Sequence, residues 1–245
     1  MISPIPSTTA VVLAGGRGTR IAHLFADVPK PMVPTAGHPF LYWMTSWLIA
    51  RNLRDIIFST GHLSETIERW ADSSDWSDVT LRCRRETQPL GTGGGLLNCL
   101  DLCGEDVVVV NGDTLVDCDL SAGLQRYHAE DLDGLLFGVE VADAGRYGTL
   151  AVDDHGLLSA FLEKRPGAGL VNSGVYIFKK RILTQFDASA PSSIETDLVP
   201  ALLAQGAQIG VQRCVDVPFI DIGTPETIAI ATDFILANPS LFTAP

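Results

Sequence analysis

A glycine-rich loop directly after the first apolar run is the densest chemical signal in the sequence. Gly15, Gly16 and Gly18 follow the apolar run at residues 9–13, with Arg17 among them. Glycine lets the backbone turn sharply and come close to a ligand, and successive N–H groups in such a turn form a concave site for an anion. Arg17 would add a charge-assisted hydrogen bond to phosphate oxygens. The loop therefore predicts a phosphate site; the alternative is a glycine-rich turn with a solvated arginine.

The glycine spacing also bears on the class of nucleotide chemistry. It matches neither G-x-G-x-x-G, which binds dinucleotides, nor the P-loop pattern that ends in Gly-Lys-Ser/Thr. Both a Rossmann oxidoreductase and a P-loop NTPase are therefore disfavoured. A fluorescence titration with reduced nicotinamide would detect the first of these classes.

A lysine between two prolines is the second candidate. Pro29 and Pro31 stiffen the backbone on either side of Lys30, so less entropy is lost in aiming its ammonium group. Such a cation suits a triphosphate whose charge must be balanced during nucleophilic attack. The alternative is a chance lysine in a proline-rich loop.

Two aspartates follow apolar runs and adjoin glycines. Asp113 comes after the valine run 107–110 and Gly112, and Asp221 lies two residues before Gly223. Ligands of open α/β sheets bind beyond the carboxyl ends of the strands, and carboxylates there can hold Mg²⁺ together with phosphates. We therefore expect Asp113 and Asp221 to share one Mg²⁺; a turn-forming aspartate and a residue approaching a helix are the alternatives.

Two further segments leave their role open. Glu163 and Lys164 follow an expected strand, where they could accept sugar hydroxyls and meet a sugar phosphate, or form an exposed ion pair. The loop 88–93 is either a base-binding loop or a helix N-terminus. The five histidines form no cluster with ligand spacing, so none is given a catalytic role.

The elements that must position these residues suggest an α/β fold. The first half alternates short apolar runs with segments of helical period, and the valine run indicates burial on both faces of a parallel sheet. Expected strands lie at 9–13, 55–59, 79–83 and 106–110, and expected helices at 40–53, 64–70 and 96–102. The second half has strand candidates at 135–141, 149–152, 157–163 and 171–178, followed by helices at 194–204 and 224–236. This order predicts a mostly parallel sheet with an antiparallel extension.

Composition narrows the class of partner. The chain has 245 residues, 46% of them hydrophobic, and a formal net charge of −12, which argues against a nucleic-acid partner. No apolar run is long enough to span a bilayer, and the N-terminus lacks a signal-peptide pattern, so the cytoplasm is the expected location. The five cysteines do not suggest a disulfide framework or a zinc shell. We expect one domain over 1–245, with the nucleotide in about 1–120 and the second substrate in about 121–245.

Taken together, these residues resemble the sugar-1-phosphate nucleotidyltransferases. The resemblance runs in order along nearly the whole chain. It rests on LAGGRGTR (13–20), PKPM (29–32), ETQPLGTGGG (86–95), NGD (111–113), YGT (147–149), EK (163–164), NSGVYIF (172–178) and FIDIGTPE (219–226). It implies a Rossmann-like α/β/α sandwich and a Mg²⁺-assisted reaction without a covalent enzyme intermediate.

The resemblance also implies a role for each matching residue. The catalytic cations would be Arg17 on the triphosphate, Lys30 on the α-phosphate and Lys164 on the sugar phosphate, and Mg²⁺ would be held by Asp113 and Asp221. The nucleotide-binding residues would be Leu13, Ala14, Gly15, Gly16, Gly18, Thr19, Gln88, Gly91, Thr92 and Gly93. The sugar-binding residues would be Gly112, Tyr147, Gly148, Glu163 and Asn172.

Within the family, the pattern looks most like the D-glycero-D-manno-heptose 1-phosphate guanylyltransferases, which serve capsule and lipopolysaccharide synthesis. The substrates would then be GTP and the heptose 1-phosphate. Mannose-1-phosphate guanylyltransferases and muramate- or glucose-1-phosphate uridylyl- or thymidylyltransferases stay open as alternatives. A non-catalytic nucleotide-sugar sensor is the rival class, and release of pyrophosphate would exclude it. No membrane partner is expected, and a homodimer is one option for the oligomeric state.

Overall fold

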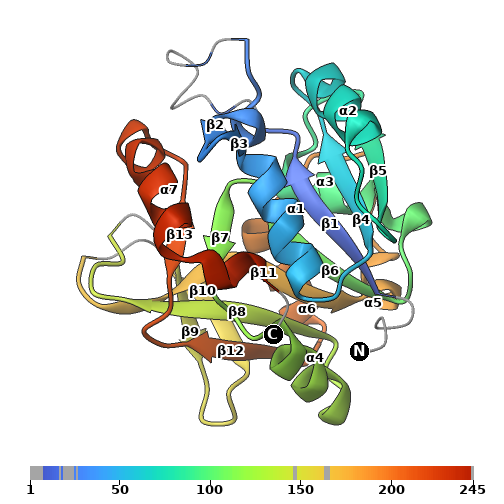
Figure 1. Ribbon diagram of the computed structural model, residues 1–245. Helices are drawn as coiled ribbons and strands as arrows, with labels where there is room; N and C mark the ends of the chain where they lie inside the picture. Colours follow the sequence, from blue (N-terminus) through green and yellow to red (C-terminus); the bar gives the residue numbers. More distant parts are fainter. Residues whose placement is uncertain are drawn as a thin grey trace.

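The architecture is described from a computed structural model, which describes residues 8–16, 18, 25, 27–145, 148–162 and 166–243 (Figure 1). Its centre is a nine-stranded sheet. Within the described ranges, no helix is long and apolar enough to cross a membrane.

Four parallel strands form one half of the sheet. They run in the order β5 (Thr80–Arg85), β4 (Asp55–Thr60), β1 (Thr8–Ala14) and β6 (Asp106–Asn111). Because the strands are parallel and in register, the last residues of β1 and β6 reach the same edge, with Leu13 opposite Asn111. The glycine-rich loop and the Asn-Gly-Asp segment are thereby brought to one place.

The other half is largely antiparallel. The long strand β11 (Gly169–Lys179) pairs antiparallel with β6 on one side and with β8 (Gly134–Val141) on the other. The strands β9 (Thr149–Val152) and β10 (Leu158–Leu162) form an antiparallel hairpin, which pairs with β11 through Thr149 opposite Val171. At the other side, β12 (Ile209–Cys214) runs parallel to β8. The predicted mostly parallel sheet with an antiparallel extension is confirmed.

Helices cover both faces of the sheet. One face carries α1 (Phe40–Ala50), α2 (Ser64–Ser73), α4 (Leu120–Ala129) and α7 (Pro225–Ala237). The other carries α3 (Gly91–Leu97), α5 (Lys180–Leu183), the one-turn π-helix η3 (Ile194–Leu198) and α6 (Val199–Ala204). Along β6, Val108 and Val110 pack into the first layer while Val107 and Val109 pack into the second. The valine run is therefore buried on both faces, which confirms the predicted α/β/α sandwich.

Several short elements lie beside the main sheet. The 3-10 helix η1 (Lys30–Met32) precedes a small ladder of β2 (Pro34–Thr35) and β3 (His38–Pro39). A separate antiparallel pair is formed by β7 (Thr114–Val116) and β13 (Phe219–Asp221). The 3-10 helices η2 (Leu100–Leu102) and η4 (Pro239–Phe242) follow α3 and α7. The pair β7–β13 matters most for function, because an aspartate adjoins each strand.

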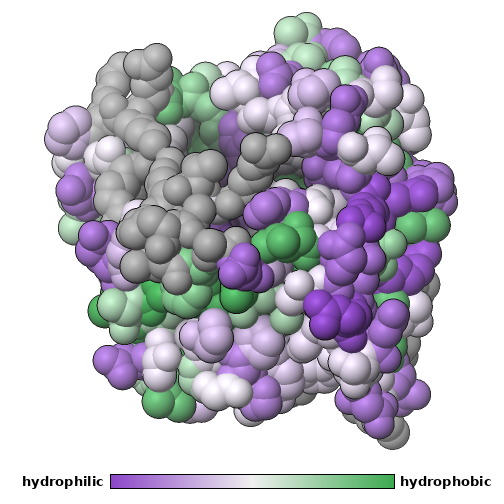
Figure 2. All heavy atoms as spheres, turned by 90° about the horizontal axis from the view of Figure 1, so that it is seen from above, coloured by the Kyte–Doolittle hydropathy of each residue, from purple (hydrophilic) through white to green (hydrophobic). Residues whose placement is uncertain are grey.

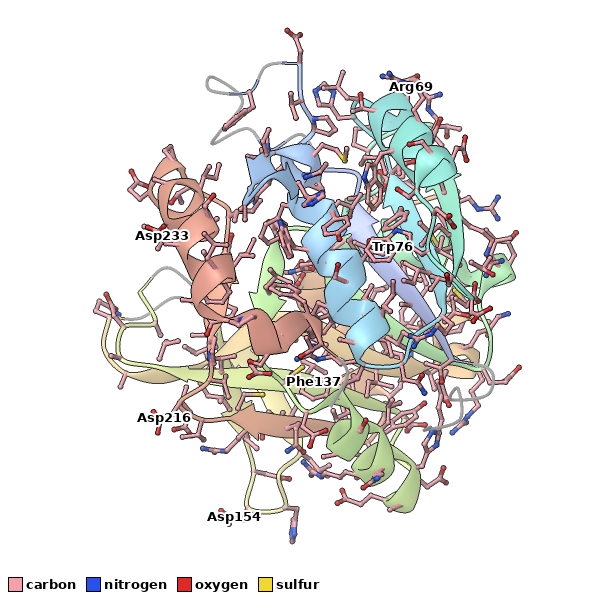
Figure 3. The ribbon with its side chains drawn as sticks, in the orientation of Figure 1. Arg69, Trp76, Phe137, Asp154, Asp216 and Asp233 are labelled. Atoms are coloured by element: carbon pink, nitrogen blue, oxygen red, sulfur yellow. The ribbon has the colours of Figure 1, made fainter. Side chains whose placement is uncertain are left out.

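Two expectations about elements were wrong or incomplete. The helix expected at 96–102 begins earlier, at Gly91, because the glycines 93–95 lie inside its first turns rather than in a loop. The sequence pattern also missed α4 and β12. In α4 the glycine at position 123 weakens the helical signal, yet it is required there: a Cβ would lie 2.4 Å from Cζ of Phe137 on the sheet beneath (Figure 3).

Candidate active site

A cleft of about 660 Å³ opens at the carboxyl ends of β1 and β6. This is the edge at which open α/β sheets bind ligands. Seen from above, hydrophilic surface gathers on the side where α2 and β5 lie in Figure 1 (Figure 2). The cleft brings together most of the described residues that the sequence assigned to the nucleotide and the metal. Its lining includes Leu13, Ala14, Gly15, Gly16, Gly18, Lys30, Gln88, Gly91, Thr92, Gly112 and Asp113.

Backbone crowding explains the glycines at the head of the cleft. A Cβ on Gly112 would lie 2.5 Å from the carbonyl oxygen of Leu13, and a Cβ on Gly61 would lie 2.7 Å from that of Gly15. These contacts are with backbone, which cannot move aside. By contrast, a Cβ on Gly16 would meet no atom of the described residues within 4 Å. Gly16 therefore leaves open space at the cleft, where a ligand can approach the main chain.

Lys30 lies at the first residue of η1, held by the flanking prolines. Its side chain is 15% exposed, and its ammonium forms an ion pair with Asp113 Oδ2. The same Nζ atom lies 4.0 Å from Asp221 Oδ1. One cation thus faces both carboxylates that the sequence assigned to a metal.

The two aspartates are held side by side by the antiparallel pair β7–β13. Thr114 of β7 is opposite Asp221 of β13, and the N–H of Ile222 donates to the carbonyl oxygen of Asp113 at 2.9 Å. Two carboxylates from different parts of the chain therefore converge on one cation position. That arrangement fits Mg²⁺, which takes one or two protein carboxylates and completes its shell with water and phosphate oxygens. In the described part of the chain there is no group of three or more side chains that could hold a metal ion together.

The sequence analysis missed Glu86, a carboxylate in the wall of the cleft. Its Oε2 accepts from the backbone N–H of Leu90 at 3.1 Å and its Oε1 from Ser59 Oγ at 3.3 Å. Burial raises the pKa of this carboxyl group, and the two hydrogen bonds oppose that shift. The signal was available in the sequence, because Glu86 begins the segment that contains Gln88. Gln88 itself is exposed and donates to the carbonyl oxygen of Ser189 at 3.2 Å.

Asn111 is a second residue that the sequence analysis did not assign. It ends β6 and lines the cleft, and its buried Oδ1 has no hydrogen-bond partner among the described residues. A buried unpaired amide oxygen is costly, so its presence indicates a ligand group that donates to it. Gly174 packs against the other side of this amide, since a Cβ there would lie 2.5 Å from Nδ2.

The remaining predicted residues are placed as follows. Gly93 packs inside α3, where a Cβ would lie 2.7 Å from Ser192 Oγ. Gly148 precedes β9, and its carbonyl oxygen accepts from the N–H of Asn172 on β11 at 3.3 Å. Arg17, Thr19, Tyr147, Glu163 and Lys164 lie outside the described residues. His62 lies in the cleft wall, where the sequence suggested no role.

Comparison with known proteins agrees with this geometry. Residues 9–238 match the family model described as nucleotidyl transferase. The chain belongs to this family. The resemblance drawn from its motifs, and the prediction that this nucleotidyltransferase chain is an enzyme, are thereby confirmed.

Named relatives of this nucleotidyltransferase fall into two groups. The chain is 32% identical over 219 residues to the D-glycero-alpha-D-manno-heptose 1-phosphate guanylyltransferase of Campylobacter jejuni, covering 89% of this chain and 95% of that protein. It is 36% identical over 223 residues to the mannose-1-phosphate guanylyltransferase of Mycobacterium tuberculosis, covering 89% of this chain but only 61% of that longer protein.

A solved structure is also similar to this chain in sequence and in fold. HddC from Yersinia pseudotuberculosis is 32% identical, with a TM-score of 0.82, over 92% of this chain and 98% of that one. HddC has also been solved in complex with GMP-PN, with the same identity, coverage and TM-score.

Proposed function

We propose that this chain is a D-glycero-D-manno-heptose 1-phosphate guanylyltransferase, which uses GTP and releases pyrophosphate. The observation that carries the proposal is the convergence of Lys30, Asp113 and Asp221 at a cleft beside a glycine-rich loop. A phosphoryl-type transfer needs little besides positioning and charge neutralisation, and this cleft supplies groups for both.

The proposed reaction balances without a general base. A phosphate oxygen of the sugar 1-phosphate, already anionic at pH 7, forms a bond to the α-phosphorus of GTP. The bond from that phosphorus to the α–β bridging oxygen breaks, and pyrophosphate leaves with the electron pair. Lys30 would neutralise charge that develops at the α-phosphate, and the backbone of the loop at Gly15 and Gly16 would hold the departing phosphates.

Mg²⁺ is the proposed metal, with Asp113 and Asp221 as its protein ligands. When bound, it would supply positive charge to the triphosphate. Lys30 occupies the space between the same carboxylates, so we infer that it turns from them toward substrate phosphate when the metal binds. The pair of aspartates therefore holds a positive group whether or not nucleotide is present.

Glu86 supports guanine as the base. Guanine presents two neighbouring N–H donors on one edge, while adenine presents no ring N–H there, so a carboxylate selects between them. Each oxygen of Glu86 accepts one hydrogen bond, from Ser59 Oγ or from the N–H of Leu90, and retains a lone pair for another. We propose that Glu86 accepts from guanine, with Gln88, Gly91 and Thr92 lining the same part of the cleft.

The sugar would lie toward β9 and β11. Asn111 Oδ1 and the amide of Asn172 are the described side-chain candidates for its hydroxyls, with Gly112 and Gly148 offering backbone contacts. Tyr147, Glu163 and Lys164 retain the roles that the motifs imply for them. In this proposal residues 1–120 serve mainly the nucleotide and 121–245 the sugar phosphate, within one cytoplasmic domain.

Mannose 1-phosphate is the second candidate substrate, because the Mycobacterium tuberculosis relative has the higher identity. The coverage favours heptose: the chain spans 95% of the Campylobacter enzyme and 94% of a second heptose enzyme, from Aneurinibacillus thermoaerophilus, but 61% of the mannose enzyme.

A matrix of pyrophosphate-release rates tests the proposal. Four nucleoside triphosphates would each be combined with heptose, mannose, glucose and muramate 1-phosphates in the presence of Mg²⁺. GTP with the heptose 1-phosphate should give the highest kcat/KM. A higher value with mannose 1-phosphate would replace the proposed sugar, and no pyrophosphate from any pair would favour a non-catalytic sensor.

A further inference from the structure

A continuous chain of hydrogen bonds joins the nucleotide side of the molecule to the sugar side. It begins at Thr92, in the first turn of α3 and in the wall of the cleft, and ends at Asn172 on β11. The two residues between them are Glu195, in the π-helical turn η3, and Tyr176, on β11. None of these connections is required by secondary structure, because every one is made by side chains.

Glu195 is the centre of the chain. Its Oε1 accepts from the hydroxyl of Tyr176 at 2.7 Å, while its Oε2 accepts from Thr92 Oγ1 at 3.2 Å and from Ser193 Oγ at 2.7 Å. One carboxylate thus connects Thr92, on the nucleotide side, to Tyr176, on the sugar side. Charge-assisted hydrogen bonds of this kind are stronger than neutral ones and fix the geometry of their donors.

Tyr176 carries the connection to Asn172. Its ring is fully buried, and its hydroxyl accepts from Asn172 Nδ2 at 2.6 Å. Burial, and then the neighbouring Glu195 charge, raise the pKa of this phenol well above its usual value, so the hydroxyl keeps its proton and donates to Glu195. The other end of the Asn172 amide is also held, because Oδ1 accepts from the N–H of Gly174 at 3.1 Å.

The strand is irregular where this contact forms. Along β11, Asn172 and Tyr176 are four residues apart, but their partners on β8, Gly138 and Leu136, are only two apart. The additional residues form a bulge, and Gly174 within it has a φ of +77°, a left-handed value that favours glycine. Bulges often re-aim side chains beside active sites, and this one brings Asn172 to the Tyr176 hydroxyl.

The helix that carries Glu195 is irregular as well. The N–H of Leu198 donates to the carbonyl oxygen of Ser193, five residues back, at 3.0 Å, which makes this turn π-helical. Single π-helical turns are uncommon and recur at functional sites. The N–H of Ile194 donates to Thr92 Oγ1 at 3.0 Å, so the same turn is attached to the cleft wall through its backbone as well.

We propose that Tyr176 and Glu195 are positioning residues that hold Asn172 and Thr92 in fixed relation, so that the sugar phosphate is aligned with the nucleotide. This inference rests on the proposed function, in which Asn172 binds a sugar hydroxyl. Tyr176 fixes the rotamer of the Asn172 amide. Glu195 fixes Tyr176 and Thr92 together, so it acts on both substrates although it contacts neither.

Tyr176→Phe tests the connection to the sugar, with Tyr127→Phe as its matched control. Tyr127 is also fully buried, and its hydroxyl donates to a carboxylate, Asp106 Oδ1, at 2.9 Å, but it belongs to α4 and does not line the cleft. We expect Y176F to raise the KM for sugar 1-phosphate about tenfold, the equivalent of one hydrogen bond, with the KM for GTP changed less than about twofold. Y127F should lower the melting temperature about as much as Y176F does, and it should change neither the KM for sugar 1-phosphate nor the KM for GTP.

Two further variants test whether the residues act as one chain. Y176F combined with Asn172→Ala should raise the sugar KM no further than Asn172→Ala alone, because both remove the same fixed amide. Glu195→Ala should raise the KM for both substrates, because it releases Thr92 and Tyr176 together.

The outcomes separate this inference from the proposed function. If Asn172→Ala raises the sugar KM while Y176F behaves like Y127F, the positioning role is overturned and the proposed function stands. Additive effects of N172A and Y176F would overturn it in the same way. If the unaltered chain transfers no guanylyl group to any sugar 1-phosphate, the proposed function itself is overturned, and this inference with it.

Discussion

The ammonium of Lys30 forms an ion pair with Asp113 and lies 4.0 Å from Asp221 Oδ1. One cation and two carboxylates that are remote in sequence therefore meet at a single point. This relationship follows from three local facts: prolines stiffen η1, Asp113 lies at the carboxyl end of β6, and β13 pairs with β7 beside it.

Lys30→Ala should lower kcat for pyrophosphate release by about 10²–10³-fold, as removal of one preorganised charge commonly does. Lys179→Ala is the matched control, because Lys179 is also paired with an aspartate and its side chain is 16% exposed, against 15% for Lys30. Lys179 is the last residue of β11 and pairs with Asp106, the first residue of β6, so it lies at the end of β6 that is remote from the cleft. Near-full turnover by Lys30→Ala would contradict its assigned role.

Asp113→Asn and Asp221→Asn should each raise the Mg²⁺ concentration needed for half-maximal rate by at least about tenfold. The reason is that a neutral amide is a poorer ligand for Mg²⁺ than the carboxylate it replaces. Titration of the rate with MgCl₂ measures this directly. The double variant should be little worse than either single one, because the two residues act on one ion. A control at Asp131→Asn, which removes only the surface partner of Lys179, should leave the titration unchanged. Unchanged Mg²⁺ dependence in both site variants would contradict the metal assignment.

Gly16→Ala and Gly112→Ala should have different effects, the first on the binding of GTP and the second on the stability of the fold. A Cβ on Gly112 meets the Leu13 carbonyl oxygen at 2.5 Å, so this variant should be less stable by about 1–3 kcal/mol. A Cβ on Gly16 meets no atom of the described residues within 4 Å, so the stability of Gly16→Ala should be close to that of the unaltered chain. Its KM for GTP should nevertheless rise, because the methyl group occupies space beside the phosphates. Denaturant unfolding measures the effect on stability, and initial rates measure the effect on the KM for GTP. An unchanged KM for Gly16→Ala would contradict the assignment of this loop to the nucleotide site.

Glu86→Gln should increase stability in a pH-dependent way. Burial raises the pKa of Glu86 in the folded state, so folded protein binds more protons than unfolded protein between the two pKa values. The free energy of unfolding therefore falls as pH rises from the pKa of an unfolded glutamate, about 4.3, through the folded pKa. Glu86→Gln should remove that fall, and its melting temperature should exceed that of the unaltered chain at pH 7 but not at pH 4.

The same Glu86→Gln variant also tests the assignment of the base. It should lower kcat/KM for GTP more than for UTP, because the carboxylate that accepts from guanine is lost. Ser59→Ala, which removes one donor to Glu86 without changing the carboxylate, serves as control. Equal losses with both nucleotides would indicate that Glu86 only supports the loop.

Much of this site could be predicted because its residues are read from local pattern. Strand ends, glycine density and proline flanks are local features, and they single out Lys30, Asp113 and the loop at Gly15, which line one cleft in the structure. What the sequence could not provide were contacts set by tertiary packing. Glu86 lines the cleft because tertiary packing places its carboxylate against Gly15, and the Asn111 amide is placed by its contact with Gly174. The link from Thr92 to Glu195 joins residues that no spacing rule relates.

The same division holds for the fold. The valine run of β6 carries its own signal of two-sided burial, whereas α4 depends on Phe137 packing against Gly123, and β12 depends on finding β8 as a parallel partner. Helix propensity alone scores Gly91–Leu97 poorly because of its glycines. Its first turn is instead stabilised by residue 192, whose carbonyl oxygen accepts from the N–H of Gly93 at 2.8 Å.

The most direct test of the account follows the α-phosphorus of GTP. The unaltered chain would be incubated with GTP labelled at the α-phosphate, D-glycero-D-manno-heptose 1-phosphate and Mg²⁺, and the products separated and identified by mass. All consumed label should appear in GDP-heptose, with one pyrophosphate released for each label transferred. Label recovered as free GMP or GDP, or left in GTP while the sugar phosphate is unchanged, would contradict it.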